Sequence, residues 1–247
     1  MKRRAVLLAL LAILLTWQLL AVLVNQPVLP PVSQVAVALL REVQRGEIML
    51  HFLASLWRVV VSMLLSVALA VPAGLALGQM PRLDRIFSPV IYWLYPIPKV
   101  VLVPVVLLLL GVGDAAKIVI IFLILFFQIL VLVRDQAAAL RPELILSVRS
   151  LGAGRRALFR YVYLPASLPG ILTALRQSVG TAVAVLYVAE LFATQYGLGY
   201  YIYLNGSTLF NYPAMYAGIV VMSVLGMILY FSVELLQKWW CPWLAPK

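Results

Sequence analysis

The sequence predicts an all-α integral membrane protein with about six transmembrane helices. Of its 247 residues, 65% are hydrophobic and only 11% are charged, and the mean hydropathy is +1.06. Soluble domains are typically about a quarter charged and about half apolar, so one soluble core could not bury this much apolar surface. The net charge of +11 would indicate a nucleic-acid partner in a soluble protein. In a membrane protein it indicates basic cytoplasmic loops, and we expect no nucleic-acid partner.

Six apolar runs predict the spans, each close to the roughly 20 residues that cross the hydrocarbon layer. The first run, 5–24, is longer than the apolar core of a signal peptide, roughly 7–15 residues, so we interpret it as an uncleaved span. Lys117, just ahead of the fourth run, can extend its ammonium group outward to water. The other five runs cover 59–78, about 88–110 with a Pro-x-Pro break inside it, 118–133, about 168–192 and 215–233.

Positive charge predicts the orientation of these spans. Most of the 19 lysines and arginines fall on one side, and by the positive-inside rule that side is cytoplasmic. Both termini and the loop 134–167 therefore face the cytoplasm. We accordingly divide the chain into an N-terminal transmembrane helix 1–24, an external amphipathic segment 25–54, a transmembrane domain 55–238 and a cytoplasmic tail 239–247.

The loop 134–167 predicts two short amphipathic helices joined at a glycine turn. The Arg-Pro-Glu sequence at 141–143 is typical of a helix start, because proline fits the first helical position and an acidic residue interacts favourably with the helix dipole there. Apolar residues follow at helical spacing through 144–151. Gly-Ala-Gly at 152–154 allows a reversal. We expect a second helix over 157–164 that stops at Pro165, because proline disfavours helix in the residue before it.

The residues of this loop allow two interpretations. Its arginines favour a position on anionic lipid headgroups. Its apolar stripe equally fits a groove on another protein. The four arginines concerned are Arg149, Arg155, Arg156 and Arg160.

RSLGA followed by LFRYVYLPASLPGI resembles the cytoplasmic loop of ABC importer permeases, and more narrowly of the sulfonate, taurine and nitrate type. The motif of that family is Glu-Ala-Ala, three residues, Gly, nine residues, Ile, one residue and Leu-Pro. Gly152 takes the place of the glycine, Val162 that of the isoleucine, and 164–165 is the closing Leu-Pro. Leu-Ser-Val at 146–148 replaces the triplet. Glu143, on nearly the same helix face, is a candidate to substitute for the missing glutamate.

Other segments resemble the same family in the same order, so that the resemblance covers about residues 28 to 240. LPPVSQVAVALLREVQRGEIMLHFLASLWRV is similar to the segment before the second span of the family. YPIPKVVLVPVVLLLLGVGDAAKI is similar to its third and fourth spans, and AELFATQYGLGYYI to the end of its fifth.

The resemblance implies a type I ABC importer permease with a MetI-like core, in a bacterial inner membrane. Such a permease has no enzymatic activity and binds no cofactor directly. Two copies form the pathway, two cytosolic ATPase subunits bind ATP and Mg²⁺ and contact the loops, and an extracytoplasmic binding protein delivers the solute. A sulfonate, taurine, nitrate or a vitamin precursor are all compatible cargoes. The implied ATPase contacts are Glu143, Leu144, Ser147, Val148, Arg149, Leu151, Gly152, Ala153, Arg156 and Phe159.

Three charged residues within or beside the spans are candidates for the transport pathway: Lys99, Arg176 and Glu190. A charge in lipid costs roughly 3 kcal/mol or more, so such residues usually face a cavity or a partner. Lys99 follows the Pro-x-Pro break, where a cationic side chain would suit an anionic cargo. Arg176 either faces the pathway or extends to the cytoplasmic interface. Glu190 either lines the outer vestibule or pairs structurally.

Other functions are less consistent with the sequence. An ion-coupled secondary transporter would use Glu190 as its ion site, but we find one broken span and no matching second half. The GVGDAAKI sequence at 111–118 lacks the glycine before the lysine and the Ser or Thr after it that a phosphate loop requires, so ATP must be bound elsewhere. One cysteine, Cys241, and one histidine, His51, cannot build a Cys/His metal site.

Small and aromatic residues predict packing and anchoring. We expect close helix packing at Gly180, Gly218 and Gly226. Trp239, Trp240 and Trp243 are typical of an interfacial anchor. Four tyrosines on the outer side either form an aromatic belt or contact a binding protein: Tyr196, Tyr200, Tyr201 and Tyr203.

Overall fold

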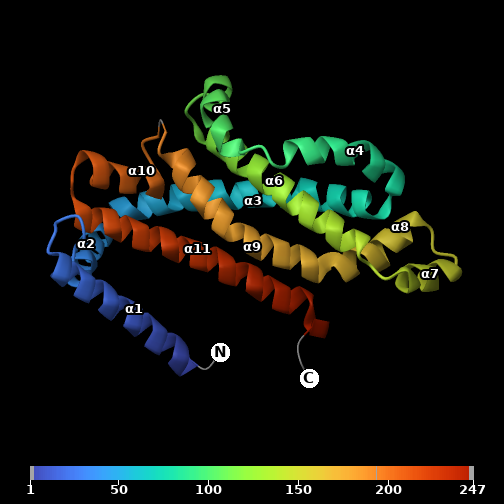
Figure 1. Ribbon diagram of the computed structural model, residues 1–247, viewed down its shortest axis with the longest axis horizontal. Helices are drawn as coiled ribbons and strands as arrows, with labels where there is room; N and C mark the ends of the chain where they lie inside the picture. Colours follow the sequence, from blue (N-terminus) through green and yellow to red (C-terminus); the bar gives the residue numbers. More distant parts are fainter. Residues whose placement is uncertain (1–2, 193, 245–247) are drawn as a thin grey trace. The chain divides into compact units, whose positions relative to one another are not determined.

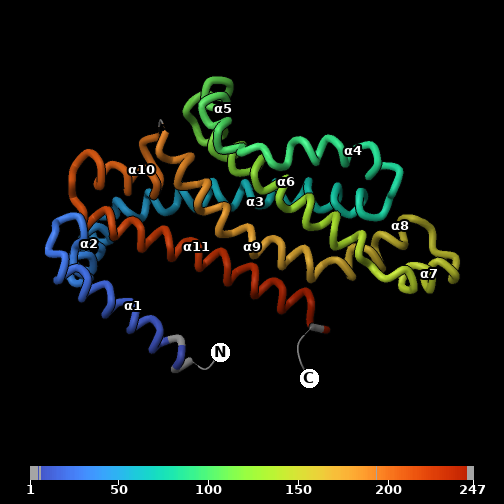
Figure 2. Tube along the Cα trace, in the orientation of Figure 1, coloured from blue at the N-terminus to red at the C-terminus, as the bar shows by residue number. Residues whose placement is uncertain are grey.

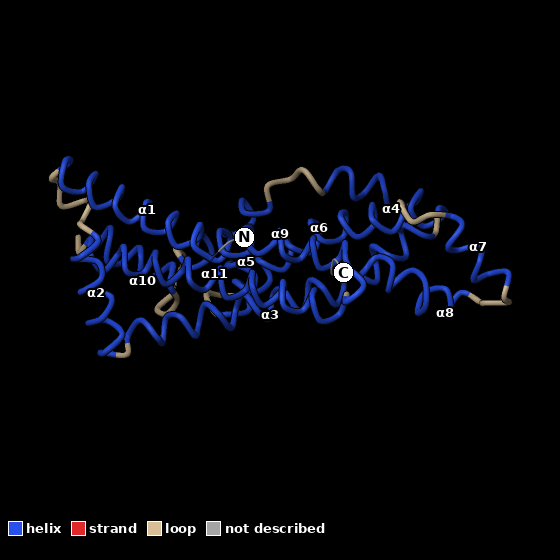
Figure 3. The backbone as a smooth tube through the Cα atoms, turned by 90° about the horizontal axis from the view of Figure 1, so that it is seen from below, coloured by secondary structure: helices blue, strands red, loops and turns tan. Residues whose placement is uncertain are grey.

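The computed structural model describes residues 3–192 and 194–244, which consist of helices and loops with no strand among them (Figure 3). The positions left out, 1, 2, 193 and 245–247, include the start of the predicted first helix and the end of the predicted cytoplasmic tail. The α-helices are α1 (Arg3–Val24), α2 (Val32–Arg45), α3 (Glu47–Gln79), α4 (Pro81–Leu94), α5 (Val103–Leu110), α6 (Asp114–Ala138), α7 (Pro142–Ser150), α8 (Arg155–Leu158), α9 (Leu164–Glu190), α10 (Leu198–Tyr203) and α11 (Tyr212–Trp240) (Figure 1).

The helices group into two compact units. The first unit contains the chain up to Ser55 together with Glu190–Val224, and so includes α1, α2 and α10. The second unit contains Leu56–Ala189 and the chain from Leu225 onward, and so includes α4 to α8 and nearly all of α9. The long helices α3 and α11 contribute to both units.

The predicted membrane spans agree with the helices. Five helical stretches are long and apolar enough to cross a membrane, and a bent pair, Pro81–Leu94 with Lys99–Leu110, makes a sixth candidate. The two parts of that pair meet at 74°, at the Pro-x-Pro break that the sequence contains. The prediction of an all-α membrane protein with about six spans is therefore confirmed, including the interruption of the third.

The second span begins earlier than the sequence indicated. The apolar run predicted a span that begins at residue 59, directly after Arg58, but α3 already starts at Glu47. The guanidinium of Arg58 lies 2.7 Å from the Asp114 carboxylate, and its side chain is only 5% exposed. A paired charge can remain inside a helix bundle, so it does not end the helix.

The side chain of Lys117 was expected to extend outward to water, and this prediction is wrong. The residue is only 1% exposed. Its ammonium donates hydrogen bonds to the carbonyl oxygens of Val112 at 2.8 Å and Gly113 at 3.3 Å. The charge therefore interacts with the backbone of the turn that precedes α6.

The second helix of the basic loop does not stop at Pro165 as predicted. The stretch Arg155–Glu190 is helical throughout, with a π-helical turn at Phe159–Tyr163. In that turn the Leu164 amide donates to the Phe159 carbonyl, five residues back. A π turn is wider than an α turn, and this one comes directly before the proline that would disrupt a regular helix.

Small residues bring α3 and α6 into close contact in the second unit. The Ser62 hydroxyl donates to the Ile118 carbonyl at 3.1 Å and the Ser66 hydroxyl to the Phe122 carbonyl at 3.3 Å. A Cβ atom on Gly78 would lie only 2.5 Å from the Arg134 carbonyl oxygen. Small residues allow helix backbones to approach closely in membranes. They occur at every fourth position of α3: Ser62, Ser66, Ala70, Gly74 and Gly78.

An ion pair joins α4 to α6 in the same unit. Arg134 contacts Asp84 at 2.5 Å through Nε and at 3.0 Å through Nη2. The same Nη2 donates to the Ser88 hydroxyl at 2.8 Å. The two-point contact fixes the orientation of α4, the first half of the broken span.

Candidate functional site

The basic loop forms a helix–turn–helix, as predicted (Figure 2). The first helix, α7, starts at Pro142 and ends at Ser150, and α8 follows at Arg155. Gly152 has a φ of +83°, and no atom lies within 4 Å of the Cβ it would gain as alanine. Glycine is therefore required here by the left-handed backbone of the turn. Its amide donates to the Arg149 carbonyl at 3.0 Å, which closes the turn.

The helix–turn–helix leaves its predicted contact residues accessible. None of the ten is buried. Leu151 at the turn is 86% exposed and Leu144 is 49% exposed, whereas Val148 is half-buried. The Ser147 side chain forms a hydrogen bond within its own helix, because its hydroxyl donates to the Glu143 carbonyl at 2.6 Å. The loop consequently presents apolar surface that the described part of the chain does not cover.

Leu146 was not among the predicted contact residues, although it stands where the family motif has glutamate. Its side chain is 61% exposed on α7. The sequence could have indicated Leu146, because the family motif has glutamate at this position. It was overlooked because a leucine there departs from the pattern.

Lys99 lies at the break of the third span, as its sequence position predicted. Its ammonium donates to the carbonyl oxygens of Leu94 at 2.8 Å, Tyr95 at 2.9 Å and Ile97 at 3.2 Å. It also lies 4.6 Å from the centre of the Phe127 ring. The charge therefore binds carbonyl groups at the end of the broken helix, where regular helical hydrogen bonding stops.

Arg176, on α9, is half-buried. Its guanidinium lies 5.6 Å from the centre of the Tyr230 ring on α11, a cation–π distance. This contact joins α9 and α11 within the second unit.

Glu190 is completely buried in the first unit. It belongs to a hydrogen-bonded cluster, here called the amide clasp, in which the backbone amides of Gly197, Leu198 and Gly199 bind the side chains of His51, Ser55 and Glu190. The Ser55 hydroxyl lies 2.8 Å from both of its carboxylate oxygens, and the Gly199 amide donates to Oε2 at 2.8 Å. The Leu198 amide donates to Ser55 Oγ at 2.8 Å, and the Gly197 amide to His51 Nδ1 at 3.0 Å. Three consecutive amides at the start of α10 thus bind three side chains.

The other members of the amide clasp were missed from the sequence. His51 and Ser55 lie one turn apart on α3, but serine and histidine at that spacing are common on helices. A Cβ on Gly197 would meet the Glu190 carboxylate, which explains the glycine. Only the fold shows that these residues meet, because Ser55 and Glu190 are 135 positions apart.

The four outer tyrosines do not share one environment. Tyr201 is only 3% exposed and its ring lies 5.3 Å from that of His51, so it takes no part in an aromatic belt or a surface. Burial raises the pKa of its phenol, and the Glu42 carboxylate adds to the shift. Tyr196 and Tyr203 are about half exposed and Tyr200 is partly buried. For these three, the aromatic belt and the contact with a binding protein both stay predictions.

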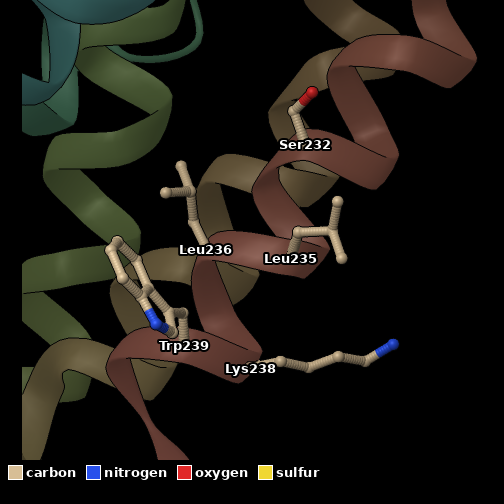
Figure 4. A pocket seen from close by; sticks show the side chains of 5 residues that line it. All are labelled: Ser232, Leu235, Leu236, Lys238 and Trp239. Atoms are coloured by element: carbon tan, nitrogen blue, oxygen red, sulfur yellow. The ribbon is translucent and has the colours of Figure 1, made fainter.

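The tryptophans predicted to form an interfacial anchor are exposed at the end of α11 and just after it. Trp239 is 80% exposed and Trp243 58% exposed. A shallow recess beside them is bordered by Ser232, Leu235, Leu236, Lys238 and Trp239 (Figure 4). Exposed indole rings next to a lysine are typical of the membrane–water interface.

The three glycines predicted to allow close packing differ. Gly218 does so, because a Cβ there would lie 2.8 Å from Ile202 and Tyr201. Gly226 allows only an ordinary contact, with Val183 at 3.6 Å. The prediction for Gly180 is wrong for the described part of the chain, where nothing lies within 4 Å of its Cβ position. Among residues 3–192 and 194–244 we also find no group of three or more His, Cys, Asp or Glu side chains able to hold a metal ion.

These features define a class of protein. A polytopic helical subunit with a broken third span and an accessible helix–turn–helix between its long helices α6 and α9 has the architecture of a transport permease. The chain belongs to the family of binding-protein-dependent transport system inner membrane components, which matches residues 67–241. It is thus a multi-pass membrane permease of the ABC importer class, as the resemblance of the loop implied.

Known proteins of this family resemble the chain over most of its length. The taurine transport system permease protein TauC of Escherichia coli (strain K12) is 31% identical over 241 residues, which cover 94% of this chain and 87% of TauC. The formylaminopyrimidine transport permease protein ThiX of Halalkalibacterium halodurans is 27% identical over 233 residues, 94% of this chain and 93% of ThiX.

A solved structure shows the same fold. A chain of the MetNI methionine ABC transporter in an inward-facing conformation superposes with a TM-score of 0.69 at 21% identity, covering 81% of this chain and 98% of that one. The predicted MetI-like architecture is therefore confirmed.

Proposed function

We propose that the helix–turn–helix formed by residues 142–159 is the element through which a cytosolic ATPase subunit drives transport. The observation that carries this proposal is the apolar surface of the turn, with Leu151 86% exposed and Leu144 and Leu146 about half exposed. Such residues on a short helix fit a hydrophobic groove of a partner protein. Anionic lipid headgroups alone would give no reason for leucine at the tip of the turn.

A continuous helical stretch connects the turn to the membrane. From Arg155 the chain continues without a break through α8, the π-helical turn and α9 to Glu190. A displacement of the turn therefore moves a span directly, since no flexible linker intervenes. ATP-driven closure of two ATPase subunits would pull two such loops together and open the permease toward the outer side.

The complete transporter would contain this chain twice, two ATPase subunits that bind ATP and Mg²⁺, and an extracytoplasmic binding protein. In this assembly the permease hydrolyses no ATP itself. Both termini and the helix–turn–helix lie in the cytoplasm, because Arg149, Arg155, Arg156 and Arg160 are on the loop. Membrane lipid surrounds the apolar faces of the long helices.

The cargo is a small polar solute of the kind that the relatives carry. The names of TauC and ThiX specify taurine and a formylaminopyrimidine. A sulfonate-type anion would be attracted to a cationic pathway, and Lys99 and Arg176 are its candidate residues. Glu190 is the third pathway candidate, and the amide clasp gives its carboxylate a structural use as well.

Isolation of the chain from its membrane in mild detergent, with mass spectrometry of what accompanies it, tests the proposal. We expect an ATPase subunit to accompany the natural chain and the Gly154→Val variant but not Gly152→Val. Both glycines lie in open space, yet only Gly152 has a positive φ, where a β-branched residue is strained. Normal ATPase attachment of the Gly152→Val variant would contradict the coupling role.

A further inference from the structure

Glu190 is the last residue of α9, the helix that continues the stretch from the helix–turn–helix into the membrane. Its carboxylate accepts hydrogen bonds from the Ser55 hydroxyl on α3 and from the Gly199 amide on α10. The Leu198 amide of α10 donates in turn to Ser55 Oγ. The end of α9 is therefore bonded through one side chain to two further helices, and all of these residues belong to the first unit.

This carboxylate holds α10 to α9 independently of the loop between them. Glu190 and Gly199 are nine positions apart in the sequence, yet the Gly199 amide donates directly to Glu190 Oε2 at 2.8 Å. A Cβ atom on Gly197 would overlap the same carboxylate, so the backbone approaches it closely. A displacement of the end of α9 is consequently passed to α10 through the carboxylate as well as through the loop.

Helix α10 is also packed against α11 within the first unit. A Cβ atom on Gly218 of α11 would lie 2.8 Å from the side chains of Tyr201 and Ile202 on α10. Both of these side chains are buried. The amide clasp binds the start of α10 to α3 and α9, while this contact fixes the body of α10 on α11, so α10 has little room to move alone.

The amide clasp depends on a carboxylate rather than on a side chain of this size. Glu190 and Ser55 are both completely buried, and a buried carboxylate is costly unless its oxygens accept hydrogen bonds. Both oxygens accept here, and hydrogen bonds to a charged acceptor are about twice as strong as neutral ones. Glutamine has one acceptor oxygen and a donor group in place of the other. The change Glu190→Gln must therefore rearrange the clasp while almost preserving side-chain volume.

We propose that Glu190 is a positioning residue of transport, which through the amide clasp makes α10 follow the displacement of α9 that ATP causes. The inference rests on the coupling role proposed above for the helix–turn–helix. Glu190 ends α9 at the side opposite the cytoplasmic loop, so the clasp carries the displacement to the outer side, where the binding protein delivers the solute. This role requires no contact between Glu190 and the solute.

Distances between spin labels on the two copies of the permease test this role. The assembled transporter carries Cys241→Ser, which removes the only cysteine of the chain, and either Ala184→Cys on α9 or Tyr203→Cys on α10, both at exposed positions. Pulsed electron paramagnetic resonance in nanodiscs compares the nucleotide-free state with the state trapped by ATP and vanadate. We expect both label pairs to change their distance by about 2 Å or more, the scale of helix shifts at subunit interfaces.

Variants of the amide clasp should separate the two labels. With Glu190→Gln or Ser55→Ala, we expect the change at position 184 to persist and the change at position 203 to be lost. Ser62→Ala is the matched control, because Ser62 is an equally buried serine of α3 that donates to the Ile118 carbonyl outside the clasp. A merely structural effect of removing a buried hydrogen bond would appear in the control too.

Three outcomes would overturn the proposal. The first is a distance change at position 203 that persists in both clasp variants. The second is an equal loss of that change in the Ser62→Ala control. The third is an unmodified clasp in which position 184 responds to ATP and position 203 does not, which would leave the coupling role intact. If neither position responds in the unmodified transporter, the coupling role itself is wrong, so the two failures are distinguishable.

Discussion

Two glycines in different regions of this permease show opposite reasons for having no side chain. Gly78, in the α3–α6 interface, is surrounded: a Cβ would lie 2.5 Å from the Arg134 carbonyl and 2.6 Å from the Ala137 methyl group. Gly152, in the helix–turn–helix, has nothing within 4 Å of its Cβ position and is required by a φ of +83°. The first glycine serves packing within the chain, and the second allows the backbone turn of the proposed ATPase contact.

The same contrast holds for the leucines and charges around these glycines. At the α3–α6 interface, polar groups find partners inside the chain, as Arg58 does with Asp114. In the helix–turn–helix, Leu144, Leu146 and Leu151 are exposed, and the arginines have no acidic partner among the described residues. Substitutions at the interface should therefore act on stability, and substitutions in the loop on assembly.

The largest effect is expected for Gly78→Val. The added side chain must push α6 away from α3, and overpacking of this kind typically costs up to about 3 kcal/mol. We expect less folded protein in the membrane and a lower melting temperature in detergent. Gly180→Val is the matched control, because nothing lies within 4 Å of that Cβ position. Equal melting temperatures for the two variants would mean that the interface is not tightly packed.

A smaller loss of stability is expected for Asp114→Ala. Arg58 is buried, and removing one partner of a buried pair is strongly destabilising, by about 3–5 kcal/mol when both are buried. Asp114 is half exposed, so we expect about 2 kcal/mol.

The double variant Arg58→Met/Asp114→Ala should regain part of the stability that Asp114→Ala loses, since an apolar side chain costs less to bury than a charge. Thermal unfolding of both variants measures this. If the double variant were less stable than Asp114→Ala, Arg58 would contribute mainly through other contacts.

Much of the contrast between the α3–α6 interface and the helix–turn–helix could be predicted from the sequence, because it depends on local patterns. The lengths of the apolar runs predicted the spans. The helical spacing of apolar residues, together with two nearby glycines, predicted the helix–turn–helix. The small residues at every fourth position of α3 are equally visible in the sequence, but the prediction named Gly180 instead, where no described residue lies within 4 Å of the Cβ position. The sequence does not distinguish a glycine that packs against another helix from one that does not, because the difference depends on which helix lies opposite in the fold.

The rest required three-dimensional contacts. Arg58 meets Asp114 across 56 positions of sequence, so the charge that marked a span border is neutralised inside the fold. The amide clasp of Glu190 likewise joins residues that no local pattern connects. Pro165 was misjudged because its effect depends on the π-helical turn ahead of it, a geometry without a sequence signature.

A loop variant should leave stability unchanged and reduce assembly. Leu151→Ser removes the most exposed apolar side chain of the turn, and burial of one leucine contributes about 1.5–3 kcal/mol to association. We expect the ATPase to bind at least tenfold more weakly, with an unchanged melting temperature of the isolated permease. Leu108→Ser on α5, at an 87% exposed leucine, is the control. A drop in melting temperature for Leu151→Ser would place this side chain in the fold of the permease itself.

The smallest effect concerns the glutamate that the loop motif lacks. If Glu143 substitutes for it, Glu143→Gln should weaken ATPase binding about threefold, as expected for one exposed charged contact of about 0.5–1 kcal/mol. In a Leu146→Glu background, which restores the motif, the same change should have almost no effect. A titration of ATPase binding to the four combinations measures the coupling between the two positions. Equal losses in both backgrounds would show that the two carboxylates act independently, and the partner would then recognise the turn through its apolar surface alone.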